Sequence, residues 1–294
     1  MFSHLVNKKK NKGKLYIVST PIGNLEDITL RAIEVLKNVD IIAAETPKIT
    51  KRLLDKYNIN TKLIINNKNN ERSKKNLFIN KLEQGFTVAL VSDAGTPCIN
   101  DPGAELVKLA QQKEIFISVV PGPNAAIAAL SLTGLYENSF YFHGFLPKKK
   151  NERKKYIKKF FNLETINIFY ESQHRLIDTL DDLASIFDKN MKLFLVKEIT
   201  KVHEKFNFDS IENLKKIILE NKKMLNGEFV LICPKLEVEK IFSDIIDYLD
   251  IIEPLIEKLP IREISKIFSK KTNMSTSLLY DYLQNLKQKS DEKK

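Results

Sequence analysis

The sequence predicts an α/β fold with two α/β sheet domains, a ligand cleft between them, and a small C-terminal helical extension. Short apolar runs rich in β-branched residues alternate with stretches in which apolar residues recur at helical spacing, a pattern typical of parallel sheets with helical crossovers. Several of the apolar runs end at Pro and Gly turns, which mark the ends of strands. Beyond residue 235 the chain keeps mainly the helical pattern.

The first domain is expected over residues 15–122, after a basic leader over 1–14 for which we expect disorder. Strand-like and helical stretches alternate through it, which favours a parallel sheet with right-handed connections. A polar turn at 66–70 precedes a further helix. Strands are predicted at 15–20, 40–45, 87–92 and 115–120, and helices at 25–38, at 51–57 and from Ala104 onward.

Three loops of this domain follow apolar strands and carry small, turn-forming residues. The first contains Pro21 and Gly23, the second runs from Ser92 to Pro97, and the third runs over 121–124. Ligands of open α/β sheets bind at the carboxyl ends of the strands, and Gly lets the backbone approach a bound molecule closely. We therefore expect the three loops to converge on one pocket.

The second domain is expected over residues 123–235. The proline-rich turn at 121–124 lies where the pattern changes, and two domains could hinge there about a cleft. Apolar strands and helices alternate again after it. Strands are predicted at 140–145, 165–170, 193–197 and 229–233, and helices at 125–132, 174–187 and 211–219.

The helical extension is expected over residues 236–294, with a disordered tail after Lys287. Two short helices are predicted at 260–268 and 275–286, joined by a polar turn. They could form a helix-turn-helix that binds nucleic acid. We favour a helical hairpin, because the second helix carries few basic side chains on one face. The apolar residues expected in its contact are Ile264, Ile267, Leu279 and Leu283.

Composition restricts the class of protein. The net charge of +11 and the pI near 9.3 favour a polyanionic partner, although biased use of Lys, Asn and Ile explains the excess of positive charge equally well.

No apolar run is long enough to cross a membrane, and no secretory signal is recognisable, so we expect a cytoplasmic protein without a membrane partner. Cys98 and Cys233 have no partners at metal-site spacing, and no metal is expected. Dinucleotide and P-loop motifs are absent.

Five motifs together resemble one family, and they occur in that family's order between about Lys14 and Pro234. The family comprises the tetrapyrrole-methylase-like methyltransferases, and the branch is the one that methylates the 2′-hydroxyl of a cytidine in the 16S RNA of the bacterial small ribosomal subunit. No single motif is decisive, but five in order form a specific signal. They are 20–32, 92–97 followed by 101–103, 121–125, 169–175 and 227–231.

The resemblance implies S-adenosyl-L-methionine as cofactor and the three loops as its binding site. Asp93 would accept from a hydroxyl or amine of the cofactor; its alternative role is to cap the next turn. Asn24 fits an N-cap equally well, and 121–124 fits a rigid interdomain turn. The expected cofactor-binding residues are Pro21, Gly23, Ser92, Asp93, Ala94, Gly95, Thr96, Pro121, Gly122 and Asn124.

The resemblance also implies that a ribose hydroxyl must be activated, which calls for a base or for cations beside the developing alkoxide. Glu198, Glu45 and Lys197 are the catalytic candidates. Glu198 could instead form a surface ion pair, and the basic run at 145–159 could be a solvated helix face. His174 could be a base, but a single histidine without a recognisable orienting partner more often has a structural role. The expected substrate-binding residues are Lys148, Lys149, Lys150, Arg153, Arg175 and Lys201, with small-subunit ribosomal RNA as partner of a homodimer.

The sequence departs from the family at several positions. Thr46-Pro47-Lys48 stands where Asp-Thr-Arg is common, Asn69-Asn70 where His-Asn is common, and Lys197 where Arg is common. Lys keeps the charge but loses the bidentate geometry of Arg. These departures leave two alternatives open: a methylase of small tetrapyrroles on the same fold, and an RNA-binding protein that has lost catalysis.

Overall fold

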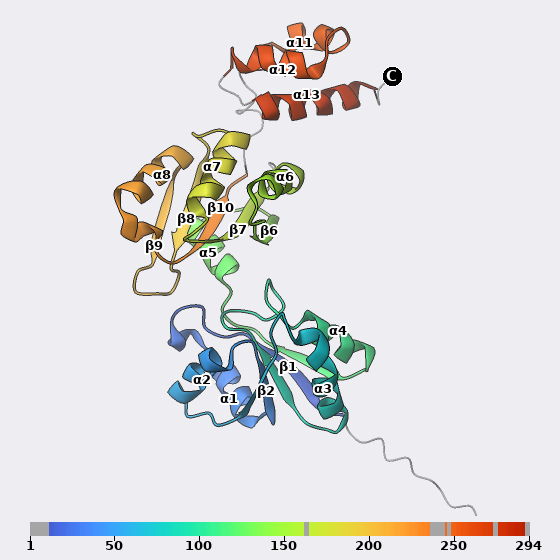
Figure 1. The fold of residues 1–294 in the computed structure, drawn as a ribbon, viewed down its shortest axis with the longest axis vertical. Coiled ribbons are helices and arrows are strands. Elements are labelled where there is room, and N and C mark those ends of the chain that lie inside the picture. Colours follow the sequence, from blue (N-terminus) through green and yellow to red (C-terminus); the bar gives the residue numbers. More distant parts are fainter. Residues whose placement is uncertain (1–11, 162–164, 236–244, 246–247, 273–275, 292–294) are drawn as a thin grey trace, which may run out of the picture. The chain divides into compact units, whose positions relative to one another are not determined.

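The structure is a computed structural model (Figure 1). It describes residues 12–161, 165–235, 245, 248–272 and 276–291. Of the expected leader over 1–14, only residues 12–14 are described. Residues 236–244, at the start of the expected helical extension, and the end of the expected tail also lie outside the described residues. The chain divides into two compact units, Met1–Ala128 (unit 1) and Ala129–Lys294 (unit 2), and each is described by itself.

Unit 1 is built on a parallel five-stranded sheet in the order β3-β2-β4-β1-β5 (Figure 1). Leu15 pairs with Val88 of β4 on one side and with Ile117 of β5 on the other. Because all strands run in the same direction, their carboxyl ends lie along one edge of the sheet. The strands are β1 (Lys14–Val18), β2 (Ile41–Ala44), β3 (Lys62–Ile65), β4 (Val88–Val91) and β5 (Phe116–Val120).

Helices cover both faces of this sheet (Figure 1). One face buries a cluster that includes Val18, Leu36 and Leu54, and the other face buries Phe78, Leu90 and Leu106. A completely buried parallel sheet explains why its strands read as continuous apolar runs. The helices are α1 (Leu30–Asn38), α2 (Pro47–Lys56), α3 (Glu71–Glu83), α4 (Ala104–Gln112) and α5 (Ala125–Thr133), the last of which spans the division between the units.

Two local expectations for unit 1 were wrong. The helix predicted at 25–38 is a 3-10 turn, η1 (Leu25–Asp27), followed by α1, because the Thr29 hydroxyl accepts the Ala32 N–H at 3.1 Å and starts the helix there. The helix predicted at 51–57 begins already at Pro47, whose fixed φ suits the first helical turn. Strand β3 was not predicted at all.

Unit 2 contains a mixed five-stranded sheet in the order β6-β7-β10-β8-β9. β6 and β7 are parallel, whereas β10 lies antiparallel between β7 and β8, and β9 is an antiparallel edge strand. The end of β7, the end of β8 and the start of β10 therefore meet at one edge. The strands are β6 (Phe140–Phe145), β7 (Ile166–Ser172), β8 (Lys192–Lys197), β9 (Lys205–Ser210) and β10 (Glu228–Cys233).

The helices of unit 2 share one buried cluster that includes Phe169, Leu180 and Leu231. Ile264, Leu279 and Leu283 belong to the same cluster, as the expected helical hairpin requires, but Ile267 is exposed. The expected sheet of 123–235 also contains β9, which was not predicted. The helices are α6 (Lys150–Phe160), α7 (Leu176–Ile186), α8 (Ile211–Glu220), η2 (Lys222–Leu225), α11 (Leu249–Ile256), α12 (Ile261–Ser269) and α13 (Thr276–Asp291).

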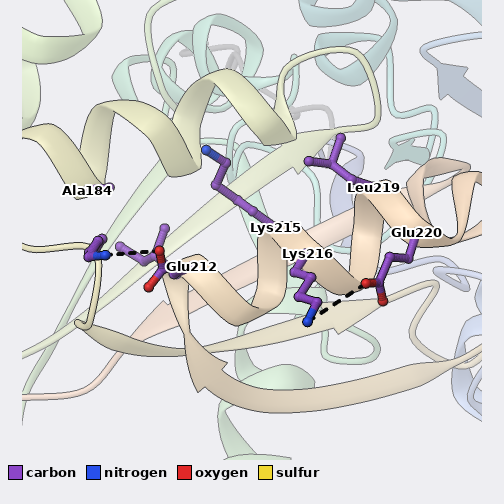
Figure 2. Close-up of a pocket in the computed structure, with 8 residues that line it drawn as sticks. Ala184, Glu212, Lys215, Lys216, Leu219 and Glu220 are labelled. Atoms are coloured by element: carbon purple, nitrogen blue, oxygen red, sulfur yellow. Dashed lines mark hydrogen bonds and ion pairs between the residues drawn. The ribbon is translucent and has the colours of Figure 1, made fainter.

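A surface groove of about 520 Å³ lies along α8 (Figure 2). Ion pairs line it, with Lys189 to Glu212 at 3.0 Å and Lys216 to Glu220 at 4.0 Å, and Leu219 is exposed beside them. None of the predicted site residues lines this groove. No helix among the described residues is long and apolar enough to cross a membrane.

Candidate functional site

Hydrogen bonds join the three glycine- and proline-containing loops of unit 1. Thr20 and Gly95 exchange two backbone hydrogen bonds, with N···O distances of 2.9 and 3.0 Å. The Thr20 hydroxyl donates to the Ser92 carbonyl at 3.1 Å. The Thr96 hydroxyl donates to the Pro123 carbonyl at 3.2 Å and lies 3.0 Å from the Ser19 hydroxyl. The loops after β1, β4 and β5 thus form one structure, which we call the loop cradle.

Two glycines are required where the loops of the cradle approach one another. Gly95 has φ +79°, in the region that side chains disfavour, and a Cβ there would lie 3.4 Å from Ile22 Cγ2. A Cβ on Gly122 would lie 3.0 Å from Ser19 Cβ. The two glycines therefore let the loops pack closely against one another; Gly95 is buried between them, whereas Gly122 is exposed.

The other residues predicted for the cradle play mixed local roles. Asn124 Oδ1 accepts the N–H groups of Ala126 and Ile127 at 3.1 and 3.2 Å, so it caps α5. Asn24 Oδ1 accepts the Glu26 N–H at 3.1 Å, which is the N-cap role weighed for it. Pro21 and Ser92 are buried, Thr96 is partly buried, and Gly23, Ala94, Pro121 and Gly122 are exposed.

Asp93 connects the cradle to helix α2. Its Oδ1 accepts the Thr46 N–H at 2.9 Å and its Oδ2 accepts the Thr46 hydroxyl at 2.7 Å. Thr46 is the residue before α2 and its side chain makes no cap hydrogen bond, so Asp93 fixes the start of that helix from another loop. The departure at position 46 therefore replaces an expected carboxylate by a hydroxyl that donates to one.

Three carboxylates gather beside the cradle, and we call them the carboxyl cluster: Glu45 after β2, Asp93 after β4, and Asp101 before α4. The Asp93 N–H donates to Glu45 Oε2 at 3.4 Å. Burial and the charges of Glu45 and Asp93 together raise the pKa of Asp101 to about 6, while Lys68 opposes them. The pKa of Glu45 is also raised, mainly by burial. Sequence reasoning assigned Asp101 to a motif but gave it no role.

Two side chains at the start of α3 and the end of β3 frame this cluster. Glu71 Oε1 accepts the N–H groups of Gly103 and Glu105 at 2.9 and 2.8 Å, which fixes the chain just after Asp101. Asn66 is 1% exposed, and neither atom of its amide has a hydrogen-bond partner among the described residues. Sequence reasoning treated Asn66 only as part of a polar turn.

The second group of predicted residues lies in unit 2, where β7, β8 and β10 meet. Glu198 Oε1 accepts the Lys201 amine at 2.9 Å and the Glu228 N–H at 2.8 Å. These partners outweigh burial and lower the pKa of Glu198. A Cβ on Gly227 would lie 2.6 Å from the Glu198 side chain, so the glycine makes room for it. Lys201 also pairs with Glu228 at 2.8 Å, and the two carboxylates raise its pKa.

Lys197 is buried at the end of β8, and burial lowers its pKa. Arg175 donates to the Leu146 carbonyl at 2.7 Å and to Glu171 at 2.8 Å, so its guanidinium ties two elements of unit 2 together. Glu171 also accepts the Thr179 hydroxyl at 2.7 Å. His174 is exposed. Of these side chains, only Lys197, Glu198 and Lys201 lie together around one strand end.

The basic run at 145–159 forms most of helix α6. Lys148, Lys149 and Lys150 are exposed at its start, and Lys149 pairs with Glu152 at 3.2 Å. Arg153 is 1% exposed and its Nε donates to Asp182 at 2.8 Å. Its charge is therefore paired with a carboxylate inside unit 2. Among the described residues, no group of three or more His, Cys, Asp or Glu side chains is placed to hold a metal ion.

Comparisons with known proteins agree with these features. Residues 14–215 match the family model described as Tetrapyrrole (Corrin/Porphyrin) Methylases. A protein from Haemophilus influenzae called ribosomal RNA small subunit methyltransferase I is 38% identical over 273 residues, covering 92% of this chain and 96% of its own. A protein of the same name from Buchnera aphidicola subsp. Schizaphis graminum is 49% identical over 199 residues, covering 68% of this chain and 70% of its own.

Solved structures show the same fold at low sequence identity. Uroporphyrin-III-C-methyltransferase from Thermus thermophilus is 20% identical with a TM-score of 0.52, covering 78% of this chain and 97% of its own. Diphthine synthase is 14% identical with a TM-score of 0.57, covering 75% of this chain and 89% of its own. The α/β fold and the sequence relatives together place the chain: it belongs to the tetrapyrrole (corrin/porphyrin) methylase family, in the group of methyltransferases whose members are called ribosomal RNA small subunit methyltransferase I.

Proposed function

We propose that this protein transfers a methyl group from S-adenosyl-L-methionine to the ribose 2′-hydroxyl of a cytidine in the 16S RNA of the small ribosomal subunit. The names of its relatives support the RNA substrate. The loop cradle is the structural observation that carries the proposal, because it joins three loops at the carboxyl edge of the sheet, where open α/β sheets bind ligands.

The residues of unit 1 fit this cofactor. Gly122 is exposed on the cradle, and the neighbouring carboxyl cluster suits a cationic group. When bound, S-adenosylmethionine supplies an electrophilic methyl group on its sulfonium. The residues proposed to hold it are Pro21, Gly23, Ser92, Asp93, Ala94, Gly95, Thr96, Pro121, Gly122 and Asn124, the last acting through the helix start that it caps.

We assign the proton acceptor to Glu45 rather than to Glu198. A general base works best when its pKa lies near the working pH. The pKa of Glu45 is raised, whereas that of Glu198 is lowered by Lys201 and by the Glu228 N–H. Glu198 then acts as a positioning residue that orients Lys201.

Lys197 and Lys201 are proposed to stabilise the negative charge of a phosphate of the RNA. Both are amines at the strand edge of unit 2, and charge-assisted donors of this kind are most effective where water is partly excluded. Arg153 and Arg175 are not proposed to bind phosphate, because their guanidinium groups bond to protein partners.

Exposed lysines of α6 and the turn before it are proposed to bind RNA phosphates. Lys148, Lys149 and Lys150 are exposed beside one another, and the chain carries a net charge of +11. Phosphate contacts of this kind give most of the affinity for nucleic acid without reading its sequence. The selection of the target nucleotide must then depend on other contacts.

We also propose that the protein acts in the cytoplasm, where ribosomal RNA is found, and as a homodimer. The edge strand β5 exposes Phe116 and Val119, and exposed apolar side chains on the edge strand of a sheet favour association with a second copy. Sedimentation velocity measures this directly, and a monomer at micromolar concentration would contradict the dimer.

One experiment tests the function as a whole. Small ribosomal subunits and free 16S RNA, both from a strain that lacks this gene, are incubated with the protein and with cofactor carrying a labelled methyl group. We expect label on one cytidine ribose, located by primer extension and mass spectrometry. Label on a base, or on a porphyrinogen offered in parallel and not on RNA, would overturn the proposal.

A further inference from the structure

The carboxyl cluster of unit 1 concentrates negative charge with little compensation. Glu45, Asp93 and Asp101 influence one another electrostatically, and Lys68 is the basic side chain that opposes them. The Lys68 amine donates to the Asn100 carbonyl at 3.1 Å instead of forming an ion pair with the cluster. Folding has therefore placed like charges together, which costs free energy unless a positive ligand also binds there.

Asn66 gives a second, independent indication of a ligand. It follows β3 in register with Glu45 after β2, because Ala44 pairs with Ile65 and the Asn66 N–H donates to the Ala44 carbonyl at 2.7 Å. Strand alternation puts Asn66 and Glu45 on the same face, the face of Ile64 and Ala43. A buried amide without hydrogen bonds is costly, so this one is suited to bind a polar group of a ligand.

The carboxyl cluster and the loop cradle share the loop that follows β4. The loop that begins at Ser92 contributes Gly95 to the cradle and ends at Asp101, and Asp93 belongs to both. A ligand held by the cradle is therefore close enough to feel the charge of the cluster.

We propose that Glu45, Asp93 and Asp101 make the protein prefer S-adenosylmethionine over the demethylated product S-adenosylhomocysteine, by attracting the sulfonium charge. The two molecules differ by one methyl group and one positive charge, so the cluster distinguishes them through that charge alone. Asn66 hydrogen-bonds a polar group that both molecules carry. This inference rests on the proposed function. It also gives a reason why the product leaves: transfer of the methyl group removes the positive charge that the carboxyl cluster attracts.

The test compares the two ligands by isothermal titration calorimetry in the absence of RNA. Near pH 8 we expect the unchanged protein to bind S-adenosylmethionine more tightly than S-adenosylhomocysteine. Asp101→Asn should reduce the ratio of the two affinities about tenfold, because it removes one nearby charge. Glu105→Gln is the matched control, since it removes the same charge from the first turn of α4, where Glu105 pairs with Lys75. It should leave the ratio unchanged.

A pH series gives a second readout from the unchanged protein. Protonation of Asp101 and Glu45 should reduce the preference for S-adenosylmethionine as the pH falls from 8 to 5, while the affinity for S-adenosylhomocysteine changes less. The charged groups that act on Asp101 are Glu45, Asp93 and Lys68, and the charges of Asp101 and Glu71 act on Cys98. The raised pKa of the Cys98 thiol, about 11, keeps it neutral throughout this range.

Asn66→Leu tests the contribution of the Asn66 amide separately from that of the carboxylate charges. It should weaken both ligands by a similar factor and leave their ratio unchanged, while thermal unfolding shows a folded protein. An unchanged ratio in Asp101→Asn and across the pH series, with both ligands bound, would overturn the inference and leave the proposed function standing. Failure of both ligands to bind the unchanged protein would instead overturn the proposed function.

Discussion

The carboxyl cluster of unit 1 and the carboxylates Glu198 and Asp182 of unit 2 differ in whether the protein compensates their charge. In unit 1, burial and like charges raise the pKa of Glu45 and Asp101. In unit 2, Glu198 pairs with Lys201 at 2.9 Å, and Asp182 pairs with Arg153 at 2.8 Å. Carboxylates that already have a cation stabilise the fold, whereas uncompensated ones are available to a ligand. The comparison thus separates structural acids from candidate functional ones.

The largest effect that this comparison predicts is on the stability of unit 2. Arg153→Ala should lower the free energy of unfolding by about 3–5 kcal/mol, because it leaves Asp182 charged and buried. Urea unfolding measures this change. The double variant Arg153→Met with Asp182→Leu should lose much less, since it removes both charges together. A loss below about 1 kcal/mol in Arg153→Ala would show that Lys154, 3.7 Å from Asp182, already compensates it.

The second effect concerns the rate of methyl transfer. Glu45→Gln should reduce the single-turnover rate by about 10²-fold or more, within the range for loss of a general base. Glu198→Gln should reduce it less, because the Glu198 carboxylate is already committed to Lys201 and to the Glu228 N–H. Cofactor and RNA affinities are measured separately for each variant. Equal rates for Glu45→Gln and the unchanged protein would show that Glu45 is not the proton acceptor.

The third effect is a pH dependence of stability with opposite signs in the two units. The pKa of Asp101 is raised to about 6 in the folded protein, so its ionisation between about pH 4 and 6 destabilises the fold. Asp101→Asn should therefore stabilise the protein at pH 8 by about 1–2 kcal/mol and change little at pH 4. The lowered pKa of Glu198 makes it stabilising above its unfolded pKa, and that contribution is lost as the pH falls.

Urea unfolding at pH 8 and pH 4 compares the two substitutions directly. Glu198→Gln should lower stability at pH 8, in contrast to Asp101→Asn, and should have a smaller effect at pH 4. If both substitutions destabilised the protein at pH 8, the carboxylates of the two units would not differ in the way proposed.

Local pattern predicted most strands because a buried parallel sheet needs continuous apolar runs, and it predicted the loops of the cradle because Pro and Gly end those runs. It missed β9, whose exposed Phe206 and Phe208 alternate with polar residues at a sheet edge. Arg153 lies one helical turn from buried Ile157, and that spacing could have shown its burial.

The carboxyl cluster was less predictable than the cradle. Asp101 and Glu45 are far apart in the sequence and come together only through the order of the strands, in which β4 lies beside β2. Asn66 was interpreted as a turn residue because it begins a polar run, although its side chain is buried. Whether a polar side chain is compensated depends on strand register, which local sequence does not reveal.

The smallest effect concerns the exposed lysines of unit 2, which complete the comparison because their charge lies at the surface, where a pair such as Lys149 with Glu152 is weak and an anion can compete for it. Replacing Lys148, Lys149 and Lys150 by Gln should weaken binding to ribosomal RNA and reduce the slope of log affinity against log salt by about 0.7–0.9 for each phosphate that the variant no longer binds. Binding is measured by filter retention at several salt concentrations. Replacing the exposed Lys37 and Lys51 of unit 1 together with Lys56 is the control, since it removes the same charge from α1 and α2. The same salt slope in both triple variants would mean that net charge, and not this surface, attracts the RNA.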